Sequence, residues 1–413
     1  MIKKYTIWLL ILFLSSCEPN TDDDTSVLRL YGDAMENIGY SISATDDGFV
    51  IGGQFTEIVR EGNRINTDSS RKKLGVIRTD ASGKIVWKKS FGGNKVAVGS
   101  KVITLKDGSF AATGYIEKSV NDLKDVFVVK ISADGSTSTQ NIFGGTGNQI
   151  GIDLIQTDEG FMVIGSTDVA RAGTADSIGN ISGKRDIYLL RLNNNLELIG
   201  APKAFGYPGN DVAVAIRNDI KNDKGGYIIL GTTENNWPNQ RLNNILILKT
   251  NIYGEPNYGP RILGSTDDEY ATDIEILDDG YLVSGIVGAD GTDQSVYLLK
   301  IPLNIFSPVT FTKKIKVSTS SSTATSFAVR AISKYVTDSF VMAGQAGTGS
   351  SAKMLIFVTD AEGNQVAGKD MITTATGVQV AYDVVTDEND DIIVVGKNSF
   401  ENNSMISLFK IRF

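Results

Sequence analysis

The sequence predicts an all-β protein, a seven-bladed β-propeller of four-stranded blades in which an N-terminal strand completes the last blade. The main observation is a repeated motif: an aromatic or aliphatic residue, three small or apolar residues and a glycine, usually after an Asp-Gly-type turn. It occurs at seven places, residues 49–53, 110–114, 161–165, 227–231, 281–285, 340–344 and 392–396. Successive closing glycines are 51 to 66 residues apart. A period near fifty residues is typical of propeller blades.

Each repeat divides into four short runs with the composition of β-strands. The first run precedes the turn, the second is the motif itself, and the third is aliphatic and ends in a basic residue, as in residues 126–130. The fourth ends in an aromatic-Gly pair such as Phe143-Gly144, although Lys316-Val317 stands in place of this pair before the sixth motif. Gly, Asp and Asn separate the runs, and helical periodicity is absent beyond the N-terminal segment.

The two chain ends complement each other. Residues 408–413 have the pattern of a third strand with no fourth strand after it, and residues 27–32 have that of a fourth strand with none before it. A ring closed by these segments has no unpaired sheet edge between its first and last blades. A β-sandwich also contains many short strands, but the sevenfold period and the complementary ends favour the propeller.

The repeats resemble the Asp-Gly-Gly-type propeller repeats of secreted bacterial proteins and, more distantly, the quinoprotein-like repeat. The run from Asp80 to Trp87 is similar to the Asp-x-x-x-Gly-x-x-x-Trp signature of the latter, with one residue fewer in the turn. The resemblance covers nearly all of the chain after the N-terminal segment. It implies the fold and no cofactor.

The N-terminal segment has the plan of a secretory signal peptide, here residues 1–16. Lys3 and Lys4 precede a short apolar run, residues 7–14, which is too short to span a bilayer. The run ends in Leu-Ser-Ser-Cys and resembles the lipobox of bacterial lipoproteins, which implies cleavage before Cys17 and lipidation of that residue. Cys17 is the only cysteine of the chain, and lipidation would explain it. An ordinary signal peptide with an incidental cysteine is the alternative.

Residues 17–26 form the lipidated cysteine and an acidic linker, and residues 27–413 form a single propeller domain. The Asp22-Asp23-Asp24 run resembles the surface-export signal of Bacteroidetes lipoproteins and implies an outer-membrane protein exposed at the cell surface. A solvated linker is the other reading of such a run. Strand direction predicts that the first strand, and therefore the lipid tether, enters the ring on the face that carries the short turns.

Composition excludes several functions. The chain has a net charge of −8, which disfavours nucleic acid as a partner because phosphate binding needs a basic surface. It contains no histidine, which excludes Ser-His-Asp and Cys-His catalysis and histidine-based metal sites. The turn carboxylates, such as Asp46 and Asp47, lack the spacing of a calcium-binding loop. We therefore expect no cofactor and no metal.

Connection lengths distinguish two faces of the ring. The turns between first and second and between third and fourth strands are short, and we call the face that they share the plain face. The connections between second and third strands are longer, at residues 54–72, 166–184 and 232–243, and we call their face the loop face. Binding residues concentrate on long loops over a rigid scaffold. The candidate binding residues on this face are Phe55, Arg60, Arg64, Tyr115, Arg171, Asn236, Trp237, Arg241 and Phe400.

Charged residues also recur along the first strands. Asp153, Asp273 and Asp383 occupy matching positions, and Lys101 and Arg330 lie at approximately the same position. Such a ring of charges would line the axial channel. A pair of carboxylates is what a glycosidase requires, but a polar column imposed by the repeat is the favoured interpretation.

Three functions fit these features. The first is a non-enzymatic surface lipoprotein that acts as a protein-interaction scaffold or accessory subunit of an outer-membrane β-barrel complex, with other lipoproteins as further partners. The second is a glycan-binding lipoprotein of a nutrient-uptake system, in which Trp237 and Tyr115 stack on sugars. The third is a glycosidase or lyase that uses Asp, Glu and Tyr. Trp237 also suits a protein interface, and a tryptophan folded onto its own blade is the structural alternative.

Overall fold

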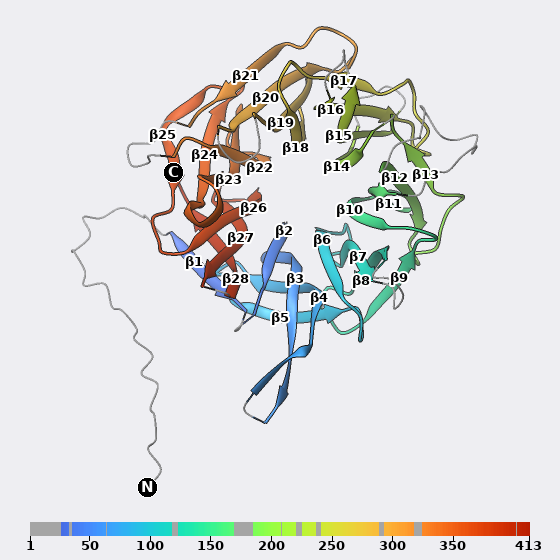
Figure 1. Cartoon of the computed structure of the whole chain (residues 1–413), viewed down its shortest axis with the longest axis vertical. Coiled ribbons are helices and arrows are strands. Elements are labelled where there is room, and N and C mark those ends of the chain that lie inside the picture. Colours follow the sequence, from blue (N-terminus) through green and yellow to red (C-terminus); the bar gives the residue numbers. More distant parts are fainter. Residues whose placement is uncertain are drawn as a thin grey trace, which may run out of the picture.

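The computed structural model describes residues 26–413 except 33–34, 63, 118–122, 169–184, 208, 220–224, 237–240, 289–292, 318–323 and 402. These residues form seven four-stranded antiparallel sheets arranged as blades around a central axis (Figure 1). Their only helix is a 3₁₀ turn, Gly349–Ser351. No helix among them is both long and apolar enough to cross a membrane. The predicted seven-bladed propeller is confirmed.

In each blade, successive strands are arranged from the central axis of the ring outward to its rim. The innermost strands are β2 (Ile38–Thr45), β6 (Ala97–Thr104), β10 (Gln149–Gln156), β14 (Asp211–Asn218), β18 (Glu269–Ile276), β22 (Phe327–Lys334) and β26 (Val378–Thr386). The second strands are β3 (Gly48–Glu61), β7 (Phe110–Glu117), β11 (Gly160–Thr167), β15 (Tyr227–Asn236), β19 (Gly280–Val287), β23 (Ser339–Ala346) and β27 (Ile392–Phe400).

The third strands are β4 (Arg64–Asp80), β8 (Lys124–Ile131), β12 (Asp186–Asn193), β16 (Arg241–Thr250), β20 (Ser295–Pro302), β24 (Lys353–Asp360) and β28 (Asn403–Ile411). The outermost strands are β5 (Ile85–Phe91), β9 (Ser138–Phe143), β13 (Lys203–Phe205), β17 (Arg261–Leu263), β21 (Phe311–Ile315), β25 (Gln365–Ile372) and β1 (Val27–Tyr31). We number the blades from β2–β5 to β26–β28.

The first and last segments close the ring as the sequence predicts. Strand β1 pairs antiparallel with β28, from Val27 opposite Lys410 to Tyr31 opposite Ile406. The Tyr31 hydroxyl donates a hydrogen bond to the Gly83 carbonyl of the first blade at 2.6 Å. This strand therefore completes the seventh blade and also ties it to the first. Its first residue, Val27, lies at the plain face, where the third strands end.

The core lies between neighbouring blades. Val50 and Val76 of the first blade, for example, pack in one buried cluster with Val102, Phe110 and Phe127 of the second. Because both faces of the middle strands are covered, these strands are continuously apolar rather than alternating. All eight residues of β11 are buried. The outermost strands face solvent, as in β9, where five of six residues are exposed.

A β-bulge at the same place in each innermost strand explains the closing glycine of the motif. The bulged residues are Tyr40, Ser100, Ile152, Val214, Thr272, Arg330 and Tyr382. A bulge bends the strand and moves a backbone carbonyl toward the second strand. A Cβ atom at any of the seven closing glycines would lie 1.9 to 2.8 Å from such a carbonyl oxygen. The motif glycine is therefore required by close backbone approach.

The first long connection of the loop face is not an irregular loop. Residues 54–72 continue β3 and β4 as a paired two-stranded ribbon, from Phe55 opposite Lys73 to Glu61 opposite Arg64. This ribbon leaves the ring and extends beyond its rim (Figure 1). The connection between β11 and β12 lies mostly outside the described residues, and the one between β15 and β16 does so at its tip.

Candidate functional site

The axial channel widens into a cavity of about 390 Å³ toward the loop face. Gln54 and Tyr115, which line it, each follow a closing glycine on a second strand and therefore lie toward the loop face. The other lining residues come from the innermost strands, at or beside the bulges. Sites for small molecules typically have volumes of roughly 300–1,000 Å³, so the cavity is large enough for one sugar-sized ligand.

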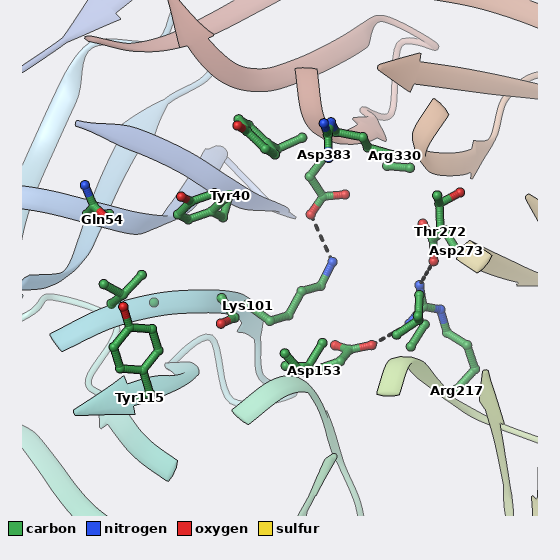
Figure 2. A pocket seen from close by; sticks show the side chains of 18 residues that line it. Tyr40, Gln54, Lys101, Tyr115, Asp153, Arg217, Thr272, Asp273, Arg330 and Asp383 are labelled. Atoms are coloured by element: carbon green, nitrogen blue, oxygen red, sulfur yellow. Dashed lines mark hydrogen bonds and ion pairs between the residues drawn. The ribbon is translucent and has the colours of Figure 1, made fainter. Parts of the chain in front are cut away.

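Ion pairs between blades cross the channel (Figure 2). Lys101 Nζ lies 2.9 Å from Asp383 Oδ2, and the Arg217 guanidinium lies between Asp153, at 2.9 Å, and Asp273. Burial lowers the pKa of Lys101 and of Arg217, but the facing aspartates outweigh it and raise both pKa values overall. Both side chains therefore remain cationic and neutralised by carboxylates.

The three aspartates also satisfy backbone N–H groups beside the bulges. Asp153 accepts from Leu154 N at 2.8 Å and from Ile216 N of the next blade at 3.0 Å. The other two repeat this arrangement, with donors Ile274 and Ile332 for Asp273, and Val384 and Ile42 for Asp383. Ser41 Oγ accepts from Val102 N. Together these bonds satisfy the backbone N–H two residues after the bulge in each of the seven blades. A buried backbone N–H without a partner would destabilise the fold.

Asp153, Asp273 and Asp383 have a structural role. Each one bonds a backbone N–H of its own strand and another of the next blade, besides a cationic side chain. A catalytic carboxylate must exchange a proton or attack a substrate, whereas these oxygens are already hydrogen-bonded between blades. The repeat imposes the column, as the sequence analysis favoured, and it does not resemble a free carboxylate pair.

Glu275 is a channel carboxyl with a raised pKa. It lies two residues beyond Asp273 on β18 and therefore on the same face of the strand. Burial raises its pKa to about 7, against the opposing effect of Arg217. Glu275 does not line the cavity at the loop face. It marks the deeper part of the channel, toward the plain face.

The mouth of the cavity carries an arc of bulged side chains from adjacent blades. Tyr40 and Tyr382 meet edge to face with ring centroids 5.0 Å apart, and the Arg330 guanidinium lies 5.1 Å from the Tyr382 centroid. Arg330 also donates to Gln345 Oε1 at 3.1 Å. Burial is the largest cause of the raised pKa of both tyrosines, so both phenols are neutral at physiological pH. Opposite this arc, Ile152 and Val214 give the cavity an apolar wall.

The structure describes three of the predicted binding side chains. Tyr115 lines the cavity, with Lys124 Nζ 4.4 Å from its ring centroid. Phe400, at the end of β27, is 40% exposed. The prediction that Phe55 is a surface binding residue is wrong. Its side chain is only 2% exposed, because its ring fills the space over Gly75, which has no side chain. Phe55 is thus a core residue rather than a surface contact.

The remaining candidates are only partly described. The backbones of Arg60 and Arg64 lie in the β3–β4 ribbon, while Asn236 ends β15 and Arg241 begins β16. Arg171, Trp237 and the lipidation candidate Cys17 lie outside the described residues. Their proposed roles stay predictions.

The sequence analysis missed Tyr40, Arg217 and Tyr382. It compared a single position per repeat, whereas each innermost strand presents side chains to the channel at the bulge and again farther along. Arg217 lies two residues after Ala215, the counterpart of Asp153. Aligning the repeats on the closing glycine and reading both positions would have found all three residues.

Comparisons with known proteins support only the fold. No protein family matches the chain, and no curated protein matches it in sequence. Among solved structures, a polysaccharide lyase described as PL25 ulvan lyase superposes with a TM-score of 0.55 at 10% identity, covering 93% of this chain and 96% of the lyase. Sqt1 from Chaetomium thermophilum gives a TM-score of 0.47 at 9% identity, covering 94% and 98% of the two chains.

A Trypanosoma rangeli sialidase gives a TM-score of 0.43 at 9% identity, covering 81% of this chain and 57% of the sialidase. These neighbours include enzymes and a protein that another structure contains bound to the N-terminus of ribosomal protein L10. The likeness to the lyase, at a TM-score of 0.55 and 10% identity, concerns the fold alone, and activity must be argued from the site. The chain is a seven-bladed β-propeller with a polar channel cavity on its loop face.

Proposed function

We propose that this protein is a non-enzymatic lipoprotein of the bacterial outer membrane, anchored through Cys17 and exposed at the cell surface. It acts as a scaffold or accessory subunit that docks on an outer-membrane β-barrel complex through its loop face. The proposal rests on the β3–β4 ribbon. The structural role of the channel aspartates supports the non-enzymatic part.

The ribbon extends β3 and β4 beyond the four-stranded sheet of the first blade. Within the described residues, β2 pairs with β3 only as far as Gln54, and β5 pairs with β4 only from Leu74 onward. Beyond these residues β3 and β4 pair with each other alone. An isolated two-stranded ribbon is marginally stable in water, and its edges readily pair with another chain. Strand addition by a partner would extend the ribbon into a larger sheet.

Contacts at its base hold the ribbon against the ring. Glu36 accepts hydrogen bonds from Lys72 Nζ at 2.8 Å and from Gln54 Nε2 at 2.9 Å. The Thr56 hydroxyl donates to the Glu36 carbonyl at 2.6 Å. The hydrogen bond from Lys72 is the largest cause of the lowered pKa of Glu36, so the carboxylate stays ionised. A ribbon oriented in this way loses less conformational entropy when a partner binds.

The position of the tether suits this role. Strand β1 starts at the plain face, and the preceding linker, residues 18–26, could span about 30 Å when extended. A lipid attached to Cys17 would then leave the loop face directed away from its own membrane leaflet or sideways toward a neighbour. A barrel with extracellular segments would meet the ribbon there.

The test is affinity purification of the tagged, lipidated protein from native membranes in mild detergent. In the key variant, residues 57–71 are replaced by Asn-Gly, which joins Thr56 to its partner Lys72 through a two-residue hairpin turn. The matched control alters the plain face, with Asp134→Asn in an exposed turn. We expect a stoichiometric outer-membrane partner with the wild type and the control, and its loss with the shortened ribbon. Recovery of the propeller alone, or a partner retained without the ribbon, would overturn the proposal.

Glycan binding is the second candidate function. The specific observation in its favour is that Tyr40, Tyr115 and Tyr382 all line the one cavity. Aromatic side chains with a polar end are suited to saccharides, because the ring packs on C–H groups and the hydroxyl forms hydrogen bonds. The two functions use separate parts of the loop face and are compatible.

A further inference from the structure

Among the described residues that line the cavity, one cation, Arg330, has no carboxylate partner. Lys101 and Arg217 form ion pairs with aspartates. Among the described residues, Arg330 has no carboxylate within ion-pair distance, and its buried Nε atom donates no hydrogen bond. Within the described part of the chain, its guanidinium donates to the neutral Gln345 amide. Arg330 lines the cavity, so an anionic ligand bound there would neutralise a guanidinium that no described carboxylate faces.

Phenol groups surround the same space. The hydroxyls of Tyr40, Tyr115 and Tyr382 form no hydrogen bond with any other described residue, although all three side chains line the cavity. Burial is the largest cause of the raised pKa of each phenol. All three therefore remain protonated at neutral pH and can donate hydrogen bonds to oxygen atoms of a ligand.

The opposite wall limits the kind of ligand. Ile152 and Val214 contribute apolar surface to the cavity. A bare inorganic anion would leave this wall uncovered, and a neutral sugar would leave the Arg330 charge unpaired. A ligand that combines a carboxylate, several hydroxyls and a C–H-rich face would match all three features.

We propose that this cavity binds the carboxylate of a sugar acid, a hexuronate or a chain end bearing one. The Arg330 guanidinium forms a two-pronged ion pair with the carboxylate, because its planar donors match the two oxygens. The phenols donate to the sugar hydroxyls, and the C–H face of the ring lies against Ile152 and Val214. This site is independent of the ribbon and does not require the docking function.

The experiment is isothermal titration calorimetry of the full lipidated protein in detergent micelles with glucuronate, galacturonate, glucose and acetate. We expect one uronate to bind at a single site, with glucose and acetate at least tenfold weaker. Arg330→Gln should weaken uronate binding by about tenfold to a hundredfold, since a hydrogen bond to a charged group contributes about 1.5–3 kcal/mol. Tyr382→Phe, which retains the ring, should weaken it by about two- to tenfold.

The matched control is Arg29→Gln, an exposed arginine on β1, which should bind like the wild type. Circular dichroism and thermal unfolding check that each variant is folded. If Arg330→Gln does not fold, Tyr382→Phe still tests the site. Absence of binding by both uronates, equal binding of glucose, or equal binding of acetate would overturn the proposal. The shortened-ribbon variant should keep its uronate affinity, so failure here is distinguishable from failure of the docking function.

Discussion

Two residue types determine the geometry of the channel wall. The closing glycine of each motif lies where the bulged strand brings its carbonyl closest, and the aspartates after the bulge bond the N–H groups that the bulge leaves unpaired. Both are responses to one backbone irregularity. The aspartates, which looked catalytic in the sequence, follow from this local requirement.

The first prediction concerns the closing glycine. A Cβ atom at Gly114 would lie 1.9 Å from the Val98 carbonyl oxygen. Gly114→Ala should therefore destabilise the protein by about 3 kcal/mol or more, because the backbone of two strands must separate. Urea unfolding measures the change. The control is Gly259→Ala, where no heavy atom lies within 4 Å of the added methyl and the change should be within about 0.5 kcal/mol. Equal effects at the two positions would refute the explanation.

The second prediction concerns the aspartates. Asp153→Ala removes the acceptor of two backbone N–H groups and one partner of Arg217. We expect a loss of about 3–5 kcal/mol, as for breaking a buried ion pair. Asp158→Ala, at an exposed turn where the carboxylate forms a solvent-exposed ion pair with Lys106, should change stability by less than about 0.5 kcal/mol. Thermal unfolding compares the two. If the variants were equally stable, the aspartate column would not be structural.

At the scale of the elements, a second polar site lies between β12 of the third blade and β14 of the fourth, where two buried aspartates face each other. Asp186 and Asp211 are 1% and 0% exposed and begin these strands. A Cβ atom at Gly206 would lie 2.4 Å from Asp186 Oδ1 and 2.6 Å from Asp211 Oδ2. The glycine of this aromatic-Gly pair therefore leaves room for two carboxyl groups. Burial raises the pKa of each to about 6, and Asp211 further raises that of Asp186.

This junction predicts a pH dependence of stability. Both pKa values are raised above the ordinary value of 3.8, so between about pH 4 and 6 the folded state binds more protons than the unfolded state. Stability must then fall as pH rises through that window, by up to about 1.4 kcal/mol per unit for each proton. Asp211→Asn should make the fall smaller. Urea unfolding at pH 4.5 and 7 measures it, and an identical fall in wild type and variant would contradict the assignment.

The strands themselves were predictable, and the ribbon was not. The period of the motif, the β-branched composition of the strands and the turn residues located every blade. The apolar runs are continuous because the middle strands of each blade are buried on both faces. Residues 54–72 are mostly polar and charged, a composition typical of a loop, because their pairing is not driven by a buried face. The comparison of one fixed position per repeat did not find Tyr40 and Tyr382, because the bulge shifts the side-chain register by one residue.

At the scale of the whole molecule, closure of the ring joins segments from the two ends of the chain. The fold could be derived because complementary ends are visible in sequence, whereas ligand and partner could not, because they depend on side chains that converge from different blades. The cavity combines residues as distant as Tyr40 and Tyr382, which touch only after closure.

Closure predicts a strong dependence on β1. Deleting residues 26–32 would expose the edge of β28 and the cavity left by Tyr31, which is 7% exposed. We expect a loss of several kcal/mol, of which Tyr31 contributes about 2 kcal/mol, together with aggregation through the open edge. A synthetic peptide of residues 26–32 should restore the melting temperature in trans. Leu28→Ala, at a 47% exposed position, is the mild control. A deletion variant as stable as this control would refute the role of β1.

The most direct test of the central claim is site-specific photocrosslinking in living cells. A photoreactive residue replaces Val59, a 39% exposed residue of the ribbon, or Ala133, an exposed residue of a plain-face turn. Docking through the loop face predicts a crosslink from position 59 to one outer-membrane barrel or lipoprotein, and none from position 133. A crosslink from position 133 alone, or none from either position, would contradict the account.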